Sequence, residues 1–90
     1  MSNIVNNIVS LELRALRKER KLTQPELSRL SGIPQNQISS METASRSPSF
    51  QNICKLCNAM NISCDEFWER CRIKMDLGEE EAKEEQAEGG

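Results

Sequence analysis

Two short helical patterns stand almost end to end in the middle of the chain. The first opens at Thr23, whose hydroxyl can cap a helix, and Glu26 follows three residues later to complete a capping box. It ends at Gly32, a residue that readily takes the left-handed conformation closing a helix. Only Ile33 separates it from Pro34, which opens the next short helix. A pair of short helices joined by a tight, glycine-containing turn is typical of a helix-turn-helix.

Three further helices are predicted around this pair. Apolar residues recur at three- and four-residue intervals over 4–22 and over 50–60. A second capping box opens a fifth helix at about 63–75, which we expect to break at Gly78. The sequence therefore predicts an all-α fold, a compact bundle of five short helices with the helix-turn-helix at its centre. The predicted core positions are Leu13, Leu16, Leu27, Ile38, Phe50, Ile53, Leu56 and Met60.

The composition argues against an enzyme and against a membrane protein. The chain has no histidine and no glycine-rich phosphate loop, and its cysteines lack a basic partner, so we expect no catalysis and no cofactor. No run approaches the roughly 18 apolar residues that cross a bilayer. The N-terminus lacks the basic start and the apolar stretch of a secretory signal. We therefore expect a cytoplasmic protein.

The four cysteines raise the question of a metal site. Cys54 and Cys57 have the spacing that often begins a zinc site, but they lie inside an apolar helical pattern. No second pair with that spacing follows, because Cys64 and Cys71 are seven residues apart. We expect reduced thiols in the core or at the surface and no metal. Control of the protein by thiol oxidation remains open.

The second helix of the central pair, at about 34–42, is the candidate for entering a major groove. Ile38 and Met41 mark its inner face. Its exposed positions are Gln35, Asn36, Gln37, Ser39 and Ser40. Gln and Asn can each make two hydrogen bonds to adenine N6 and N7, worth about 1–3 kcal/mol of discrimination. The residues expected to contact base edges are Gln35, Asn36, Gln37 and Ser40.

Charge is divided unevenly along the chain. Residues 1–75 contain eleven Lys or Arg and seven Asp or Glu, whereas residues 76–90 contain seven acidic residues and one lysine. A basic body suits a nucleic-acid partner, which the overall net charge of −2 conceals. We expect a DNA-binding domain at 10–75 and a flexible acidic tail at 76–90. Residues 1–9 are an arm or an extension of the first helix, which begins near either Ser2 or Ser10.

Residues 13–67 resemble the Cro/cI-type helix-turn-helix family, which is also called lambda-repressor-like or XRE-like. The ordered set of motifs and loop lengths carries the resemblance, rather than any single motif. The motifs are Leu13-x-x-Leu16-Arg17, Leu22-Thr23-Gln24-x-Glu26-Leu27-Ser28, Gly32-Ile33-x-x-x-x-Ile38-Ser39-x-Met41-Glu42, Pro48-Ser49-Phe50-x-x-Ile53-x-x-Leu56-Cys57 and Asn61-Ile62-x-x-Asp65-Glu66-Phe67.

The resemblance implies roles for individual residues. Gln24 is similar to the family's glutamine that clamps a DNA phosphate. Arg17 and Glu42 match a partly buried ion pair between the first and third helices. Arg46 lies in the loop that usually runs along the DNA backbone. The expected phosphate contacts are Gln24, Arg14, Thr43, Ser45 and Arg46.

The chain departs from the family pattern at three positions. Ser28 stands where alanine is usual, and it is small enough for a tight helix crossing. Ala44 stands where glycine is usual, which affects the turn that directs Thr43 and Ser45. Pro34 replaces the usual Ser or Thr cap and lacks its side-chain hydrogen bond.

The expected function is a sequence-specific transcriptional regulator of double-stranded DNA, a repressor that acts as a dimer by covering a promoter. Trp68 and Cys71 are candidates for a dimer interface, because Phe67 already fills the family's core position; alternatively Trp68 packs on the fourth helix. The alternative function is an antitoxin or another module that uses the same fold to hold a partner protein, such as a toxin or a regulator.

Overall fold

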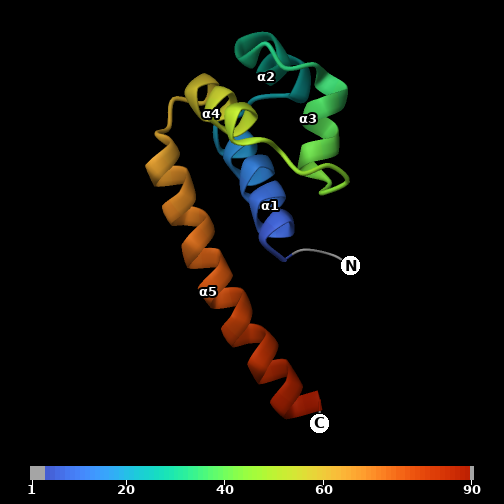
Figure 1. Cartoon of the computed structure of the whole chain (residues 1–90), viewed down its shortest axis with the longest axis vertical. Helices are drawn as coiled ribbons and strands as arrows, with labels where there is room; N and C mark the ends of the chain where they lie inside the picture. The colour runs from blue at the N-terminus through green and yellow to red at the C-terminus, as the bar shows by residue number, and fades with distance from the viewer. Residues whose placement is uncertain (1–3, 90) are drawn as a thin grey trace.

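The computed structural model describes the backbone of residues 4–89 and the side chains of residues 7–76. Within these residues the chain forms only helices: α1 (Ile4–Glu19), α2 (Gln24–Ser31), α3 (Gln35–Glu42), α4 (Phe50–Ala59) and α5 (Cys64–Gly89). Figure 1 shows α1 at the centre of the body, with α2 above it, α3 to its right, α4 to its upper left and α5 running down its left side. The all-α prediction with a central helix-turn-helix is confirmed.

Helices α1 to α5 enclose one apolar core. Seven of the eight predicted core residues are buried, and the buried stripe of α4 runs through Ile53, Leu56 and Cys57. Phe50 was predicted to belong to this stripe, and that prediction is wrong, because its side chain is 66% exposed. It is the first residue of α4, one turn before Ile53, and the body of the protein does not extend to cover it.

Side-chain caps determine where the helices begin. Thr23 Oγ1 accepts the Glu26 N–H at 3.2 Å, and the Thr23 N–H donates to Glu26 Oε1 at 3.0 Å, so the predicted capping box is present. Ser49 Oγ accepts the N–H of Asn52 at 3.1 Å and starts α4. Ser63 Oγ accepts the N–H of Glu66 at 3.1 Å and starts α5.

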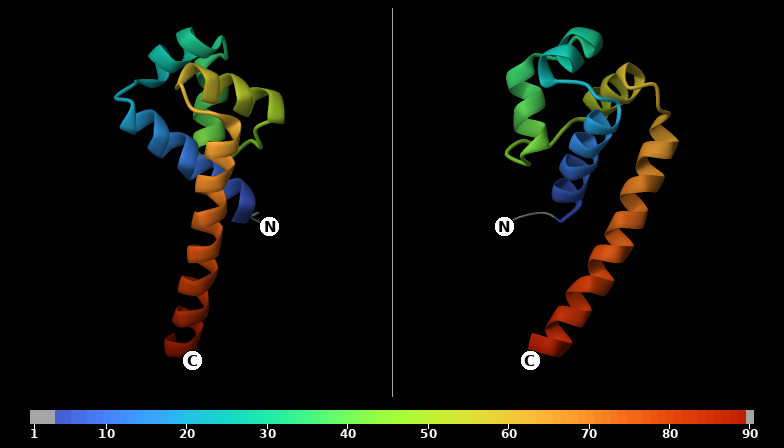
Figure 2. Two further views of the ribbon diagram at one scale, coloured as in Figure 1. Left: turned by 90° about the vertical axis from the view of Figure 1, so that its left-hand side faces the viewer. Right: turned by 180° about the vertical axis from the view of Figure 1, so that it is seen from behind.

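The first helix has the longer of its two expected extents, and the last helix extends beyond its expected end. α1 begins at Ile4, so residues 4–9 extend the first helix, and Ile8 and Val9 are buried. α5 was expected to end before Gly78, but it continues to Gly89 and passes beyond the other helices (Figure 2). A single glycine costs a helix only about 1 kcal/mol relative to alanine, and the glutamates, alanines and lysine that follow it favour the helix. No helix in the described part of the chain could cross a lipid bilayer.

A buried carboxylate fastens α5 to α1. The Glu12 side chain is fully buried and pairs with Arg70, whose Nε lies 2.5 Å from Glu12 Oε1, and with the Lys74 ammonium. Arg70 also pairs with Glu19, which lies about two helical turns after Glu12 on α1. These contacts join residues more than fifty positions apart in the sequence, and no sequence motif marks them.

Candidate nucleic-acid interface

The turn between α2 and α3 consists of Gly32, Ile33 and Pro34. Gly32 has a φ of 77° and donates its N–H to the Ser28 carbonyl at 2.9 Å, which closes α2. Ile33 is buried, and its carbonyl accepts the Ser28 hydroxyl at 2.6 Å. The serine at position 28 therefore ties the end of α2 to the turn, a role that an alanine could not perform. The structure thus fixes the angle at which α3 leaves α2.

One face of α3 is held by the core and another faces solvent. Ile38 and Met41 are each 1% exposed, so α3 cannot rotate without breaking core contacts. Gln35 and Asn36 are exposed, whereas Gln37 and Ser40 are half-buried. Three successive residues of a helix point 100° apart, so the adjacent amides do not share one face.

One line along α3 runs through Asn36 and Ser40 to Thr43, the residue that follows the helix, at spacings of four and three residues. The hydroxyl of Ser40 donates to the Asn36 carbonyl at 3.0 Å, and that of Thr43 donates to the Ser39 carbonyl at 3.0 Å. The Ser45 hydroxyl donates to the Ser40 carbonyl at 3.1 Å. Phosphate oxygens are acceptors only, so the hydroxyls of Thr43 and Ser45 must turn away from these carbonyls before either can donate to a phosphate.

Glu42 is the centre of a polar network between α1, α2 and α3. The Arg17 guanidinium donates to both Glu42 oxygens, at 2.8 and 3.0 Å, and also to the Leu22 carbonyl at 2.8 Å. The Gln24 amide donates to Glu42 Oε1 at 3.1 Å. The hydrogen bond to Glu42 raises the pKa of Arg17, against the opposing effect of burial. The side chain expected to clamp a phosphate, Gln24, is therefore oriented by the ion pair.

Three of the residues expected to contact phosphate lie around one small hollow. A pocket of about 200 Å³ is lined by Arg14, Gln24 and Thr43 together with the Arg17–Glu42 pair. Arg14 is exposed, and no acidic residue other than Glu42, which Arg17 already neutralises, lines the pocket. The pocket carries a net positive charge and suits an anion.

Two other basic residues have different positions: Arg46 lies near α3, whereas Arg20 contacts α4. Arg46 is exposed in the loop after α3, and its backbone N–H donates to the Ser40 carbonyl at 3.3 Å. Arg20 belongs to the basic cluster of α1, but its Nε donates to the Met60 carbonyl at 2.9 Å and thereby caps α4. The structure therefore brings Arg14 to the pocket beside α3 and places Arg46 just after that helix.

The two residues predicted for a dimer interface differ in exposure. Trp68 is half-buried and meets Phe67 edge-on, with ring centroids 5.6 Å apart. Cys71 was a candidate for this interface, which requires an outward-facing side chain, and that expectation is wrong, because its side chain is fully buried. It follows Phe67 by four residues, which places both on the inner face of α5. Cys71 is therefore not available to a second subunit.

Comparisons with known proteins agree with this arrangement. A helix-turn-helix family model matches residues 13–67, more than half of the chain. Among solved structures, the chain is similar to the clp gene regulator ClgR from Corynebacterium glutamicum, with a TM-score of 0.81 and 20% identity, covering 98% of this chain and 92% of that one. A comparison with curated proteins found no match.

The chain is also similar to the restriction-modification controller protein C.Esp1396I. A point mutant of that protein gives a TM-score of 0.79 and 26% identity, covering 86% of this chain and 96% of that one. The wild-type protein gives a TM-score of 0.78 and 22% identity, covering 82% of this chain and 95% of that one.

Proposed function

We propose a mechanism from one premise: this chain belongs to the Cro/cI-type helix-turn-helix family of DNA-binding transcriptional regulators. In this mechanism the protein is a repressor that binds a specific duplex site as a dimer and covers a promoter. The observation that supports it best is the exposed surface of α3, which the buried Ile38 and Met41 hold in place beside a cationic pocket.

In the proposed complex α3 lies in the major groove and α2 crosses the sugar–phosphate backbone. Gln35 and Asn36 are exposed at the N-terminal end of α3, where a recognition helix contacts base edges, and Gln37 and Ser40 flank them. Each amide can donate and accept at one adenine, which discriminates adenine from the other bases by about 1–3 kcal/mol.

Phosphate contacts supply the sequence-independent part of the affinity. The pocket beside α3 receives one phosphate, with Arg14 and the Gln24 amide as donors. Arg46 contacts the neighbouring phosphate, and Thr43 and Ser45 join after their hydroxyls leave the carbonyls that they now bind. Because these contacts release counterions from DNA, affinity falls steeply as salt is raised.

One such domain covers too little DNA for tight specific binding, since single modules bury roughly 600–1,000 Å². A symmetric dimer on inverted half-sites about one helical turn apart doubles the contact area. The half-buried Trp68 on α5 is the residue we propose for the subunit contact.

The test is selection of bound fragments from a random duplex pool at a defined salt concentration. The expected result is an enriched inverted repeat, with a stoichiometry of two chains per site. Asn36→Ala should lower affinity for the selected site about 5–100-fold and relax the base preference at one position of each half-site. Asn58→Ala removes an exposed asparagine from α4 instead and should leave affinity unchanged.

Two outcomes count against the proposal. A pool without enrichment, or affinity that does not depend on salt, removes duplex DNA as the ligand of this surface. Equal affinity of the wild-type and Asn36→Ala proteins for the selected site would contradict base recognition by α3. In either case, co-purification of a partner protein would favour the antitoxin-type function.

A further inference from the structure

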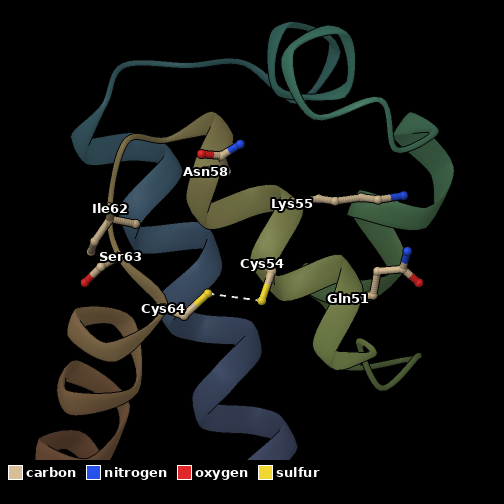
Figure 3. A pocket seen from close by; sticks show the side chains of 7 residues that line it. All are labelled: Gln51, Cys54, Lys55, Asn58, Ile62, Ser63 and Cys64. Atoms are coloured by element: carbon tan, nitrogen blue, oxygen red, sulfur yellow. Dashed lines mark hydrogen bonds between the residues drawn. The ribbon is translucent and has the colours of Figure 1, made fainter.

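Two cysteine side chains meet where α4 turns into α5. The Sγ of Cys64, the first residue of α5, donates to the Sγ of Cys54 in α4 at 3.1 Å. Figure 3 shows the two thiols pointing at each other across this corner. A disulfide needs a sulfur–sulfur distance of about 2.05 Å, so the two atoms need to approach by only about 1 Å.

The same pair can be reached from solvent. Cys54 and Cys64 are half-buried, and both line an open pocket of about 460 Å³ between α4 and the start of α5. The other two cysteines differ: Cys57 is 1% exposed and Cys71 is 0% exposed. Burial raises the pKa of Cys57 to about 12 and that of Cys71 to about 11, so neither forms the reactive thiolate near neutral pH.

We propose that Cys54 and Cys64 form a reversible intramolecular disulfide when the protein meets a hydroperoxide. One of the two thiols, as its thiolate, attacks an oxygen of the peroxide; the O–O bond breaks, and a sulfenic acid and an alcohol, or water from hydrogen peroxide, are formed. The second thiolate then attacks the sulfenic sulfur, and the hydroxyl leaves as water with the proton of the second thiol. The two thiols together lose two electrons and two protons, and the peroxide gains them.

The pairing differs from the one that the sequence motif suggests. Cys54 and Cys57 have the familiar two-residue spacing, but the sulfur that contacts Cys54 belongs to Cys64. The hydrogen bond from Cys64 also raises the pKa of Cys54, so oxidation at neutral pH is slow and becomes faster in mildly alkaline solution. An oxidation rate that rises with pH is therefore expected when a thiolate attacks the peroxide.

The disulfide fastens the start of α5 to α4. It closes a loop of about ten residues and restricts the unfolded chain more than the folded one. The thermal midpoint of the oxidised protein should lie about 10–20 °C above that of the reduced protein. The proposed disulfide includes no residue of α3, so its formation and the rise in the thermal midpoint do not depend on the proposed DNA binding.

The test uses the reduced chain, treated with hydrogen peroxide and then blocked with N-ethylmaleimide in denaturant, so that the buried Cys57 is also alkylated. Trypsin separates Cys54, in peptide 47–55, from Cys57 and Cys64, which share peptide 56–70. The expected product is a cross-link of these two peptides with maleimide on Cys57, which dithiothreitol reverses. Cys64→Ser should abolish both the cross-link and the rise in the thermal midpoint, whereas Cys71→Ser should keep the cross-link.

Several results would overturn the proposal. A disulfide within peptide 56–70 would mean that Cys57 reacts with Cys64, and maleimide on Cys64 in the cross-linked product would mean that Cys57 reacts with Cys54. Disulfide-linked dimers, or sulfinic acid on Cys54 without any cross-link, would show that the two thiols do not combine within one chain. The mapping is done on the wild-type protein, so it does not depend on any variant folding.

Discussion

Three helices of this protein end near a residue other than glycine in the left-handed region. Lys21, Ala44 and Asn61 have φ values of 56°, 63° and 58°. Asparagine tolerates this conformation, but a residue with a Cβ and no local hydrogen bond is strained there, by about 1–2 kcal/mol. Ala44 follows α3 and leads into Ser45 and Arg46, so this strain lies at the proposed edge of the DNA interface.

Replacing Ala44 by glycine should stabilise the protein by about 0.5–1 kcal/mol. The glycine removes the Cβ clash, and its greater freedom in the unfolded chain cancels part of the gain. Urea unfolding measures the difference. Ala15→Gly is the matched control, because Ala15 lies inside α1, where glycine should cost about 1 kcal/mol. A destabilised Ala44→Gly protein would mean that the turn is not strained.

Arg17→Ala should destabilise the protein by about 3–5 kcal/mol, because it leaves a buried carboxylate without its main partner. The Glu42 side chain is 3% exposed, and only the Gln24 amide would still donate to it. Arg14→Ala removes an exposed arginine one turn earlier on the same helix and should change stability by less than about 0.5 kcal/mol. Equal unfolding midpoints for the two variants would contradict the role of the ion pair.

At the scale of the helix, the capping box of α2 makes stability depend on pH. The hydrogen bonds from the Thr23 N–H and hydroxyl lower the pKa of Glu26. A lowered folded-state pKa stabilises the fold at pH values above the unfolded pKa, and the contribution is lost as pH falls through the folded pKa.

Glu26→Gln keeps an acceptor oxygen in the capping box but removes the titration. The wild-type protein should therefore lose more stability than the variant between about pH 7 and about pH 3, as followed by urea unfolding at each pH. The remaining carboxylates titrate in both proteins and cancel in the comparison. Parallel stability profiles would show that Glu26 has an ordinary pKa in the folded state.

The attachment of α5 to α1 depends on Glu12. Glu12→Gln should cost about 2 kcal/mol, since it weakens the contacts with both Arg70 and Lys74. The two cations are partly exposed and remain solvated, so the cost is smaller than for Arg17→Ala. Hydrogen exchange should increase in residues 64–76 more than in α3. Glu69→Gln, which removes an exposed pair with Arg72 inside α5, should change neither stability nor exchange appreciably.

At the scale of the whole molecule, the C-terminal part of α5 changes the charge that DNA meets. Residues 79–90 contain six glutamates and one lysine, so their removal changes the net charge from −2 to +3. Truncation after Gly78 should raise affinity for arbitrary duplex DNA several-fold at about 50 mM salt, and the difference should vanish by about 0.5 M salt.

A full-length chain with all six glutamates changed to glutamine is the matched control for length. Its non-specific affinity should rise like that of the truncated protein if charge is the cause. If only the truncated protein binds more tightly, the segment obstructs the DNA sterically rather than repelling it. Fluorescence anisotropy with a labelled random duplex measures both variants.

Sequence alone sufficed for features in which a side chain acts on backbone nearby. The starts of α2, α4 and α5 were predictable, because Thr23, Ser49 and Ser63 each cap an N–H only three residues away. The turn at Gly32 was predictable because glycine adopts a positive φ, here 77°, without a clash of a Cβ atom. The buried position of Cys71 was within reach as well, since a helix places it on the same face as Phe67.

Other features depend on which distant residues the fold brings together. The sequence shows Glu12 as a charged residue on a helix, and only packing reveals that it is buried against Arg70 and Lys74. The contact between Cys54 and Cys64, and the exposure of Phe50, likewise follow from how α4 and α5 sit on the body. Helix starts and turns were determined locally, because capping and backbone conformation act within one turn. Burial, ion pairing and thiol contact were decided by the tertiary structure, because each depends on the neighbours that surround a side chain from other helices.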